Sequence, residues 1–211
     1  MDWITIALVT HISSGYLGLF SGFVAVYAKK KKGLHSKAGT VFFYSLIIAN
    51  ITALILSTVR FSPFLFVIAL FTLYLICGGK IVVAVKRREL LARYWKLLMY
   101  SGILIIVLLL SVASLMLQNN PGPAIVLYVF SLVMILLVTD DFRRNPAENP
   151  QNKIYQHINK MGGGFIAATT AFLVVNISFL PPLLVWIAPT VIGSVLIAKG
   201  TRQYKRRTAK A

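Results

Sequence analysis

The sequence predicts an all-α integral membrane protein, a bundle of seven transmembrane helices. Three observations support this prediction: 58% of the 211 residues are hydrophobic, only 13% are charged, and the mean hydropathy is +0.79. Soluble domains carry about 25% charged residues, and a chain of this length cannot bury so much apolar surface in a water-soluble core. These values exclude a soluble enzyme, a disordered chain and a disulfide-stabilised secreted protein.

Seven apolar stretches are long enough to cross a bilayer, which takes about 20 residues per helix. The longest connection between them, roughly residues 140–160, contains Pro146 and Pro150 and reads as a loop rather than as a soluble domain. We therefore expect a single seven-span domain over residues 1–211. We expect the spans at residues 3–28, 38–56, 61–85, 95–117, 122–139, 161–180 and 182–199.

Short polar or basic connections separate these spans in order. The first span is followed by lysines at 29–32 rather than by a cleavage site, so we expect it to be a retained anchor. The connections at 60–63, at 118–123 and around Pro181 are only a few residues long. They leave no room for an extracytoplasmic binding domain.

The distribution of cations predicts the orientation. The chain has 22 Lys and Arg residues against five acidic residues, a net charge of +17, and every cation except Arg60 falls on one side of the predicted membrane. The positive-inside rule then places the N-terminus outside and the C-terminus in the cytoplasm. Because this rule explains the charge, we expect anionic lipids at the cytoplasmic face as partners and no nucleic acid.

Polar residues inside the outer half of the bundle are the first candidate site. His11 lies about 12 Å into the first span at about 1.5 Å per residue, Asn50 has a similar depth on the second span, and Asn176 is shallower on the sixth. Polar groups in hydrocarbon are costly, so we expect His11 within hydrogen-bond reach of the second or sixth span, with Asn50 as the first partner. The alternative is that these groups only join helices.

His11 also shares a helical face with small residues. The spacing of three and four residues defines this face, and small residues let a neighbouring helix approach closely. We therefore expect the face to pack inside the bundle. Its members are His11, Ser14, Gly15, Gly18, Gly22 and Ala25.

A second candidate site lies at the basic side. His35 and His157 each stand just before an apolar span, Asp140 and Asp141 end the fifth span, and Met161 follows His157 by one helical turn. Two histidines and two carboxylates at one depth could bind a divalent metal, or a haem through both imidazoles. The alternative is that they are interfacial residues that cap helices and meet lipid headgroups. Their convergence requires the second and sixth spans to be neighbours, which the sequence does not establish.

The stretches HISSGYLGLFSGFVAVYAKKKKGLHSKAGTVFFYS and HINKMGGGFIAATTAFLVVN, followed by LPPLLVWIAPTVIG, resemble a family of bacterial polytopic membrane proteins catalogued as domain of unknown function 2306. The resemblance implies the seven-span architecture in a bacterial inner (cytoplasmic) membrane and assigns no reaction. Family members often carry arginines where this chain has Ser36 and Lys160, and lysine lacks the guanidinium fork. The motifs map onto His11, Gly15, Gly22, His35, Gly39, His157 and Met161.

No motif of a known reaction is present, since the sequence contains no nucleotide-binding loop, no Ser-His-Asp order and no cysteine motif. Our first hypothesis is the handling of a small molecule or a proton through a polar core that runs from His11 and Asn50 to the cytoplasmic histidines. The second is a haem-binding protein resembling b-type cytochromes, or a metal-dependent redox or lipid-modifying protein, that uses His35 and His157. A purely structural role also stays open, because a fold does not fix a function.

Overall fold

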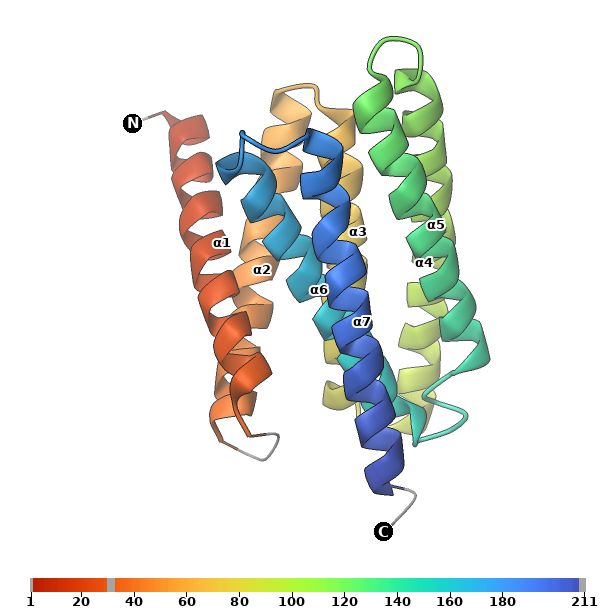
Figure 1. Cartoon of the computed structure of the whole chain (residues 1–211). Helices are drawn as coiled ribbons and strands as arrows, with labels where there is room; N and C mark the ends of the chain where they lie inside the picture. Colours follow the sequence, from red (N-terminus) through yellow and green to blue (C-terminus); the bar gives the residue numbers. More distant parts are fainter. Residues whose placement is uncertain (1, 30–32, 209–211) are drawn as a thin grey trace. The chain divides into compact units, whose positions relative to one another are not determined.

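The computed structural model describes residues 2–29 and 33–208, and these residues form seven α-helices with no strand among them (Figure 1). All seven described helices are long and apolar enough to cross a membrane, which confirms the all-α prediction for this part of the chain and agrees with a multi-pass membrane protein. The helices are α1 (Trp3–Tyr27), α2 (Leu34–Val59), α3 (Pro63–Ala84), α4 (Arg88–Met116), α5 (Pro121–Arg143), α6 (Asn152–Asn176) and α7 (Pro182–Thr208).

Several helices extend beyond the predicted spans at their basic ends. We expected starts at 38, 95 and 161, whereas α2, α4 and α6 begin at Leu34, Arg88 and Asn152. Hydropathy detects only the part of a helix that lies in hydrocarbon, while the backbone hydrogen bonds continue into polar sequence. The expected loop at 140–160 is therefore mostly helical. Of the predicted basic residues, Lys30, Lys31, Lys32 and Lys210 lie outside the described residues, as do the side chains of Lys205, Arg206 and Arg207.

Local sequence sets where the helices begin. Pro63, Pro121 and Pro182 are the first residues of α3, α5 and α7, the position where a missing N–H costs no helical hydrogen bond. Asp2 caps α1 by accepting a hydrogen bond from the Thr5 N–H at 2.8 Å. Hydrogen bonding to Thr5 lowers the pKa of the Asp2 carboxyl. Such caps satisfy amides that the first helical turn leaves open.

The chain divides into two compact units, Met1–Leu73 and Tyr74–Ala211, and the boundary lies inside α3. In the first unit α1 packs along α2. A Cβ at Gly18 would lie 2.9 Å from Cδ2 of Leu46, so the glycine lets the two helices pack closely without a shift of the Leu46 side chain. The predicted small-residue face is confirmed for four of its six members, because Ser14, Gly18, Gly22 and Ala25 are buried. Of the other two, His11 and Gly15 are half-buried.

In the second unit, helices that follow each other in sequence pack together, α4 with α5 and α6 with α7. The helix α7 also contacts α5, where the Phe130 and Trp186 rings meet edge to face with their centroids 6.2 Å apart. Trp95 of α4 is fully buried. The C-terminal half of α3 belongs to this unit and contacts α6 through glycines on both helices.

Candidate functional site

Lys160 is completely buried inside the second unit, although it lies in a helix apolar enough to cross a membrane. Its Nζ atom donates a hydrogen bond to Oδ2 of Asp141 at 2.7 Å, and both side chains are 1% exposed. The Tyr74 hydroxyl donates to the same carboxylate oxygen. Helices α3, α5 and α6 thus each contribute one polar side chain to a buried group, Tyr74, Asp141 and Lys160, which we name the Lys160 cluster.

Two aromatic rings complete the surroundings of the Lys160 ammonium. Its Nζ lies 4.1 Å from the centroid of the Tyr74 ring and 5.5 Å from that of the Trp95 ring. Cation–π contacts of this kind contribute about 2 kcal/mol when they are desolvated. The Lys160 cation is therefore stabilised by a carboxylate and by the faces of two aromatic rings.

The C-terminal end of α5 also favours the positive charge of Lys160. The indole Nε1 of Trp95 donates to the main-chain carbonyl of Asp141 at 3.1 Å. This carbonyl belongs to the last turn of α5, in which the Asp140 carbonyl accepts the Arg144 N–H at 2.8 Å. The partial negative charge of a helix C-terminus attracts a cation, so the position of Asp141 in the last turn of α5 favours the Lys160 ammonium that its carboxylate binds.

Glycines of α3 create the space for Lys160. A Cβ at Gly78 would overlap Cδ of Lys160, and a Cβ at Gly79 would lie 2.6 Å from Cγ of Met161. On α6, a Cβ at Gly164 would lie 2.6 Å from Cγ2 of Ile76. Small residues on both helices let the backbones approach closely, so the long methylene stem of Lys160 fits between them.

The two carboxylate oxygens of Asp141 have different surroundings. Oδ2 accepts hydrogen bonds from Lys160 and Tyr74, whereas Oδ1 is buried and has no hydrogen-bond partner in the described part of the chain. An unsatisfied buried polar atom costs about 1–3 kcal/mol. Such an atom is a candidate point for binding a proton or a hydrogen-bond donor of a ligand.

A second polar group, around Asp140, joins the Lys160 cluster to the surface. Asp140 pairs with Arg144 at 3.2 Å, and the side chains of these two residues are 25% and 38% exposed. The guanidinium of Arg144 lies 4.2 Å from the centroid of the Tyr155 ring. The buried Gln156 donates to Oδ2 of Asp140 at 3.3 Å and lies one helical turn before Lys160 on α6. Polar groups therefore continue from the partly exposed end of α5 to the buried ion pair.

All three histidines make the same type of contact between helices. In each ring Nδ1 is paired with a main-chain carbonyl of another helix, and a carbonyl can only accept, so Nδ1 carries the proton. His11 and His35 join α1 to α2, and His157 joins α6 to α3. The acceptors are Ala49 at 2.8 Å for His11, Ala25 at 2.8 Å for His35 and Gly79 at 2.9 Å for His157.

The predicted polar core of the outer half is formed only in part. His11 does lie within hydrogen-bond reach of the second span, but its partner is the Ala49 carbonyl rather than Asn50. Asn50 and Asn176 each donate to the carbonyl four residues earlier in their own helices, Leu46 and Phe172, both at 2.7 Å. The expectation that Asn50 is the first partner of His11 is therefore wrong.

The ligand candidates of the basic side also have other partners. Asp140 faces Arg144 and Asp141 faces Lys160, while Met161 packs against Gly79. In residues 2–29 and 33–208, no group of three or more His, Cys, Asp or Glu side chains could hold a metal ion. His35 belongs to the first unit and His157 to the second, so an ion or haem shared by them stays a prediction.

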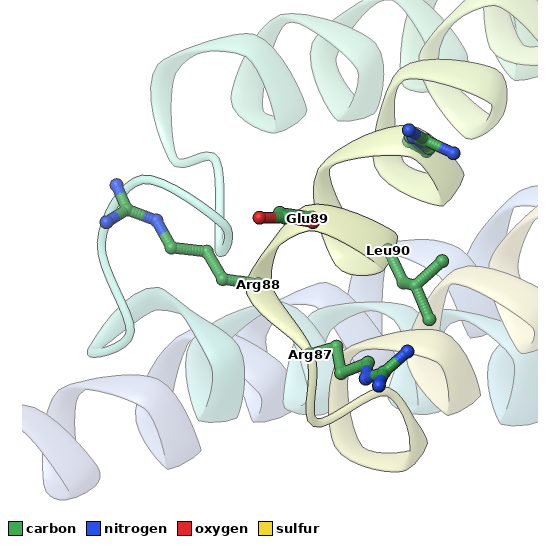
Figure 2. A pocket seen from close by; sticks show the side chains of 5 residues that line it. Arg87, Arg88, Glu89 and Leu90 are labelled. Carbon is green, nitrogen blue, oxygen red and sulfur yellow. The ribbon is translucent and has the colours of Figure 1, made fainter.

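A separate hollow of about 550 Å³ lies at the start of α4, lined by Arg87, Arg88, Glu89, Leu90 and Arg93 (Figure 2). Figure 2 shows Arg87 and Leu90 on one side of the helix start, with Arg88 extended toward the segment between α5 and α6. The Nε of Arg88 donates to the Ala147 carbonyl of that segment at 2.8 Å. This hollow shares no lining residue with the Lys160 cluster.

Sequence reasoning missed Lys160 as a site residue, together with Tyr74, Trp95 and Gln156. In the sequence Lys160 counts among the cations that predict the orientation, because the predicted sixth span begins one residue after it. A signal was present in the spacing, since Gln156, Lys160 and Gly164 recur every four residues and all three are buried on one face of α6.

No protein-family model, curated protein or solved structure matches the chain. The resemblance to the family catalogued as domain of unknown function 2306 therefore stays a prediction.

Proposed function

We propose that this protein handles protons within the membrane and that Asp141 is the group that takes up and releases the proton. One observation carries the proposal: the buried Lys160–Asp141 pair, whose Oδ1 atom has no partner among the described residues, lies in helices apolar enough to span a membrane. Ionisable side chains in membrane helices are rare and costly, and they typically belong to ion or proton pathways.

The groups around Asp141 determine what a proton would do. Tyr74 from α3, Lys160 from α6 and the adjacent Asp140 are the titratable groups near the carboxylate, and α4 contributes the neutral Trp95. A proton that binds Oδ1 forms an O–H bond and removes the negative charge that holds the Lys160 ammonium. Removing one charge of a buried pair costs about 3–5 kcal/mol. Protonation is therefore coupled to how tightly α6 is held against α5.

The proposed route to Asp141 begins at the Asp140–Arg144 pair. These side chains are partly exposed, and Gln156 and the Lys160 cluster behind them are buried. Water reaches the outer pair and supports proton exchange there, whereas apolar helix surrounds the inner pair. A small molecule that moves together with the proton would use the same polar groups.

We further propose that this end of the bundle faces the cytoplasm of a bacterial cell, with the N-terminus outside. The support is the charge asymmetry, because every Lys and Arg except Arg60 falls on that side. A phosphatase that is active only outside the cytoplasm should be inactive when it is fused after Arg144 and active after Asn120. The opposite pattern would reverse the orientation.

Proteoliposomes test the proton-handling function. We expect an imposed pH gradient, followed with an enclosed pH-sensitive dye, to decay faster with the wild-type protein than with Asp141→Asn or with empty vesicles. The control is Asp140→Asn, which makes the same change one residue away in a partly exposed side chain. Equal decay for the wild type and Asp141→Asn would refute proton movement through this group.

Infrared spectroscopy of the protein in nanodiscs locates the proton. As the pH is lowered, the wild type should gain a C=O stretching band of a protonated carboxyl in a dry environment. Asp141→Asn should lack this band, and Asp140→Asn should keep it. A band that persists in Asp141→Asn would assign the proton to another group.

A further inference from the structure

We infer that the hollow at the start of α4 binds a phosphate group, either the headgroup of an anionic membrane lipid or the phosphate of a soluble compound. Its lining contains three arginines and one acidic residue within seven consecutive positions, 87–93. Its volume of about 550 Å³ falls within the roughly 300–1,000 Å³ of typical small-molecule sites. This inference is independent of the proton-handling function proposed above.

The arginines provide the chemistry that phosphate requires. Guanidinium groups bind phosphate oxygens through two parallel N–H donors, and such charge-assisted bonds are about twice as strong as neutral ones. Arg87 and Arg93 are exposed, and neither forms an ion pair with an acidic side chain in the described residues. Arg88 contributes differently, because its Nε is bonded to the Ala147 carbonyl, and Ala147 is itself buried. Arg88 thus fixes one wall of the hollow.

The start of α4 adds backbone donors. Its N-cap residue Arg87 makes no side-chain capping bond, and the first helical hydrogen bond joins the Leu91 N–H to the Arg87 carbonyl at 3.0 Å. The amides of the first turn therefore point out of the helix end without helical acceptors. Together with the helix dipole, they favour an anion at this end.

The surface of α4 favours a lipid as the source of the phosphate. Leu90 forms the apolar part of the lining, and the exposed residues Tyr94, Leu97 and Leu104 follow it along the helix. Their spacing of three and four residues, with Ser101 between them, places them on one face of α4. A lipid whose headgroup occupies the hollow could lay its acyl chains along this face.

Glu89 opposes anion binding and provides a sensitive control. It is the only acidic residue of the lining, and its carboxylate would repel a phosphate. Glu89→Gln should therefore strengthen binding, whereas loss of the arginines should weaken it. Opposite effects from neighbouring exposed positions would not arise from loss of the fold.

The test uses the full chain in phosphatidylcholine nanodiscs that contain a small fraction of phosphatidylglycerol, with bound lipid counted by native mass spectrometry. Arg87→Gln/Arg93→Gln should lower retention of phosphatidylglycerol by at least about tenfold. The matched control is Lys86→Gln/Lys96→Gln, which removes two charges from exposed neighbours that do not line the hollow. At about 1 M salt, where the Debye length is about 3 Å, the control should change retention by less than about twofold.

A soluble phosphate compound is distinguished by a second arm. Glycerol 3-phosphate is titrated by calorimetry into nanodiscs that contain phosphatidylcholine alone. If glycerol 3-phosphate binds to the wild type and Arg87→Gln/Arg93→Gln abolishes this binding, the hollow takes a soluble phosphate. If glycerol 3-phosphate does not bind while phosphatidylglycerol is retained specifically, the hollow takes a lipid. The inference would be overturned if the arginine and lysine double variants lost phosphatidylglycerol retention equally, or if neither lost any. Either result would leave only a diffuse attraction between the basic surface and anionic lipid.

Discussion

Gly78 of α3 lies directly against the Lys160 side chain of α6, with no room for even a methyl group between them. A Cβ at Gly78 would overlap Cδ of Lys160 and would also lie 2.8 Å from Cδ2 of Leu98. Lys160 cannot move aside freely, because its Nζ is bonded to Asp141 at 2.7 Å. The position of the buried ammonium therefore depends on a glycine of another helix.

Gly78→Ala should destabilise the protein by about 1–3 kcal/mol, the usual cost of an overpacked core. The measurement is thermal or chemical unfolding of the purified protein in detergent. Gly39→Ala is the matched control, since a Cβ at this helical position would meet no atom within 4 Å. The control should be neutral, or stabilising by up to about 1 kcal/mol because alanine favours helix. Equal destabilisation by the two variants would show that Lys160 adjusts without cost.

The Lys160–Asp141 pair should behave as one unit in a double-mutant cycle. Lys160→Met leaves the Asp141 carboxylate buried without its cation and should cost about 3–5 kcal/mol. Asp141→Asn keeps an acceptor for the Tyr74 hydroxyl, so the double variant Lys160→Met/Asp141→Asn should recover part of this loss. Unfolding of the four proteins gives the coupling energy, expected at about 0.5–3 kcal/mol. Additive effects would mean that the two charges do not stabilise each other.

The seven helices and the packing face of α1 could be predicted from the sequence. A membrane helix must satisfy its backbone hydrogen bonds internally, so apolar length alone predicted all seven helices. The packing face of α1 could also be predicted, because glycines and serines recur on one side of a single helix. Both features are properties of one segment and need no knowledge of its neighbours.

The candidate site, in contrast, depends on contacts between helices. The burial of Lys160 requires Tyr74, Trp95 and Asp141, which come from three other helices whose packing partners no local pattern reveals. The partner of His11 is a main-chain carbonyl, a group that every residue carries, so nothing in the sequence distinguishes Ala49 from its neighbours. The amide of Asn50 was an attractive but incorrect partner because its own helix satisfies it.

The histidines should share one tautomer. Because His11, His35 and His157 each place Nδ1 against a main-chain carbonyl, we expect Nδ1–H in the neutral rings, with Nε2 as the unprotonated nitrogen. Imidazole ¹⁵N chemical shifts at high pH measure this directly, with assignment by single His→Gln variants. A ring with its proton on Nε2 could not donate to the carbonyl and would contradict the corresponding contact between helices.

The packing of α1 on α2 gives the last prediction. A leucine at Gly18 would place its Cβ 2.9 Å from Cδ2 of Leu46 and its larger side chain inside α2, so Gly18→Leu should cost about 1–3 kcal/mol or more. Gly15→Leu makes the same change one turn earlier, where a Cβ would meet nothing within 4 Å, and Leu17→Phe enlarges an exposed side chain. Leu17→Phe should unfold within about 0.5 kcal/mol of the wild type, as surface substitutions usually do. Gly15→Leu should be neutral, or stabilising by up to about 1 kcal/mol because leucine favours helix. Unfolding in detergent at several temperatures would measure the three differences, and equal shifts would place the glycine face toward lipid instead of α2.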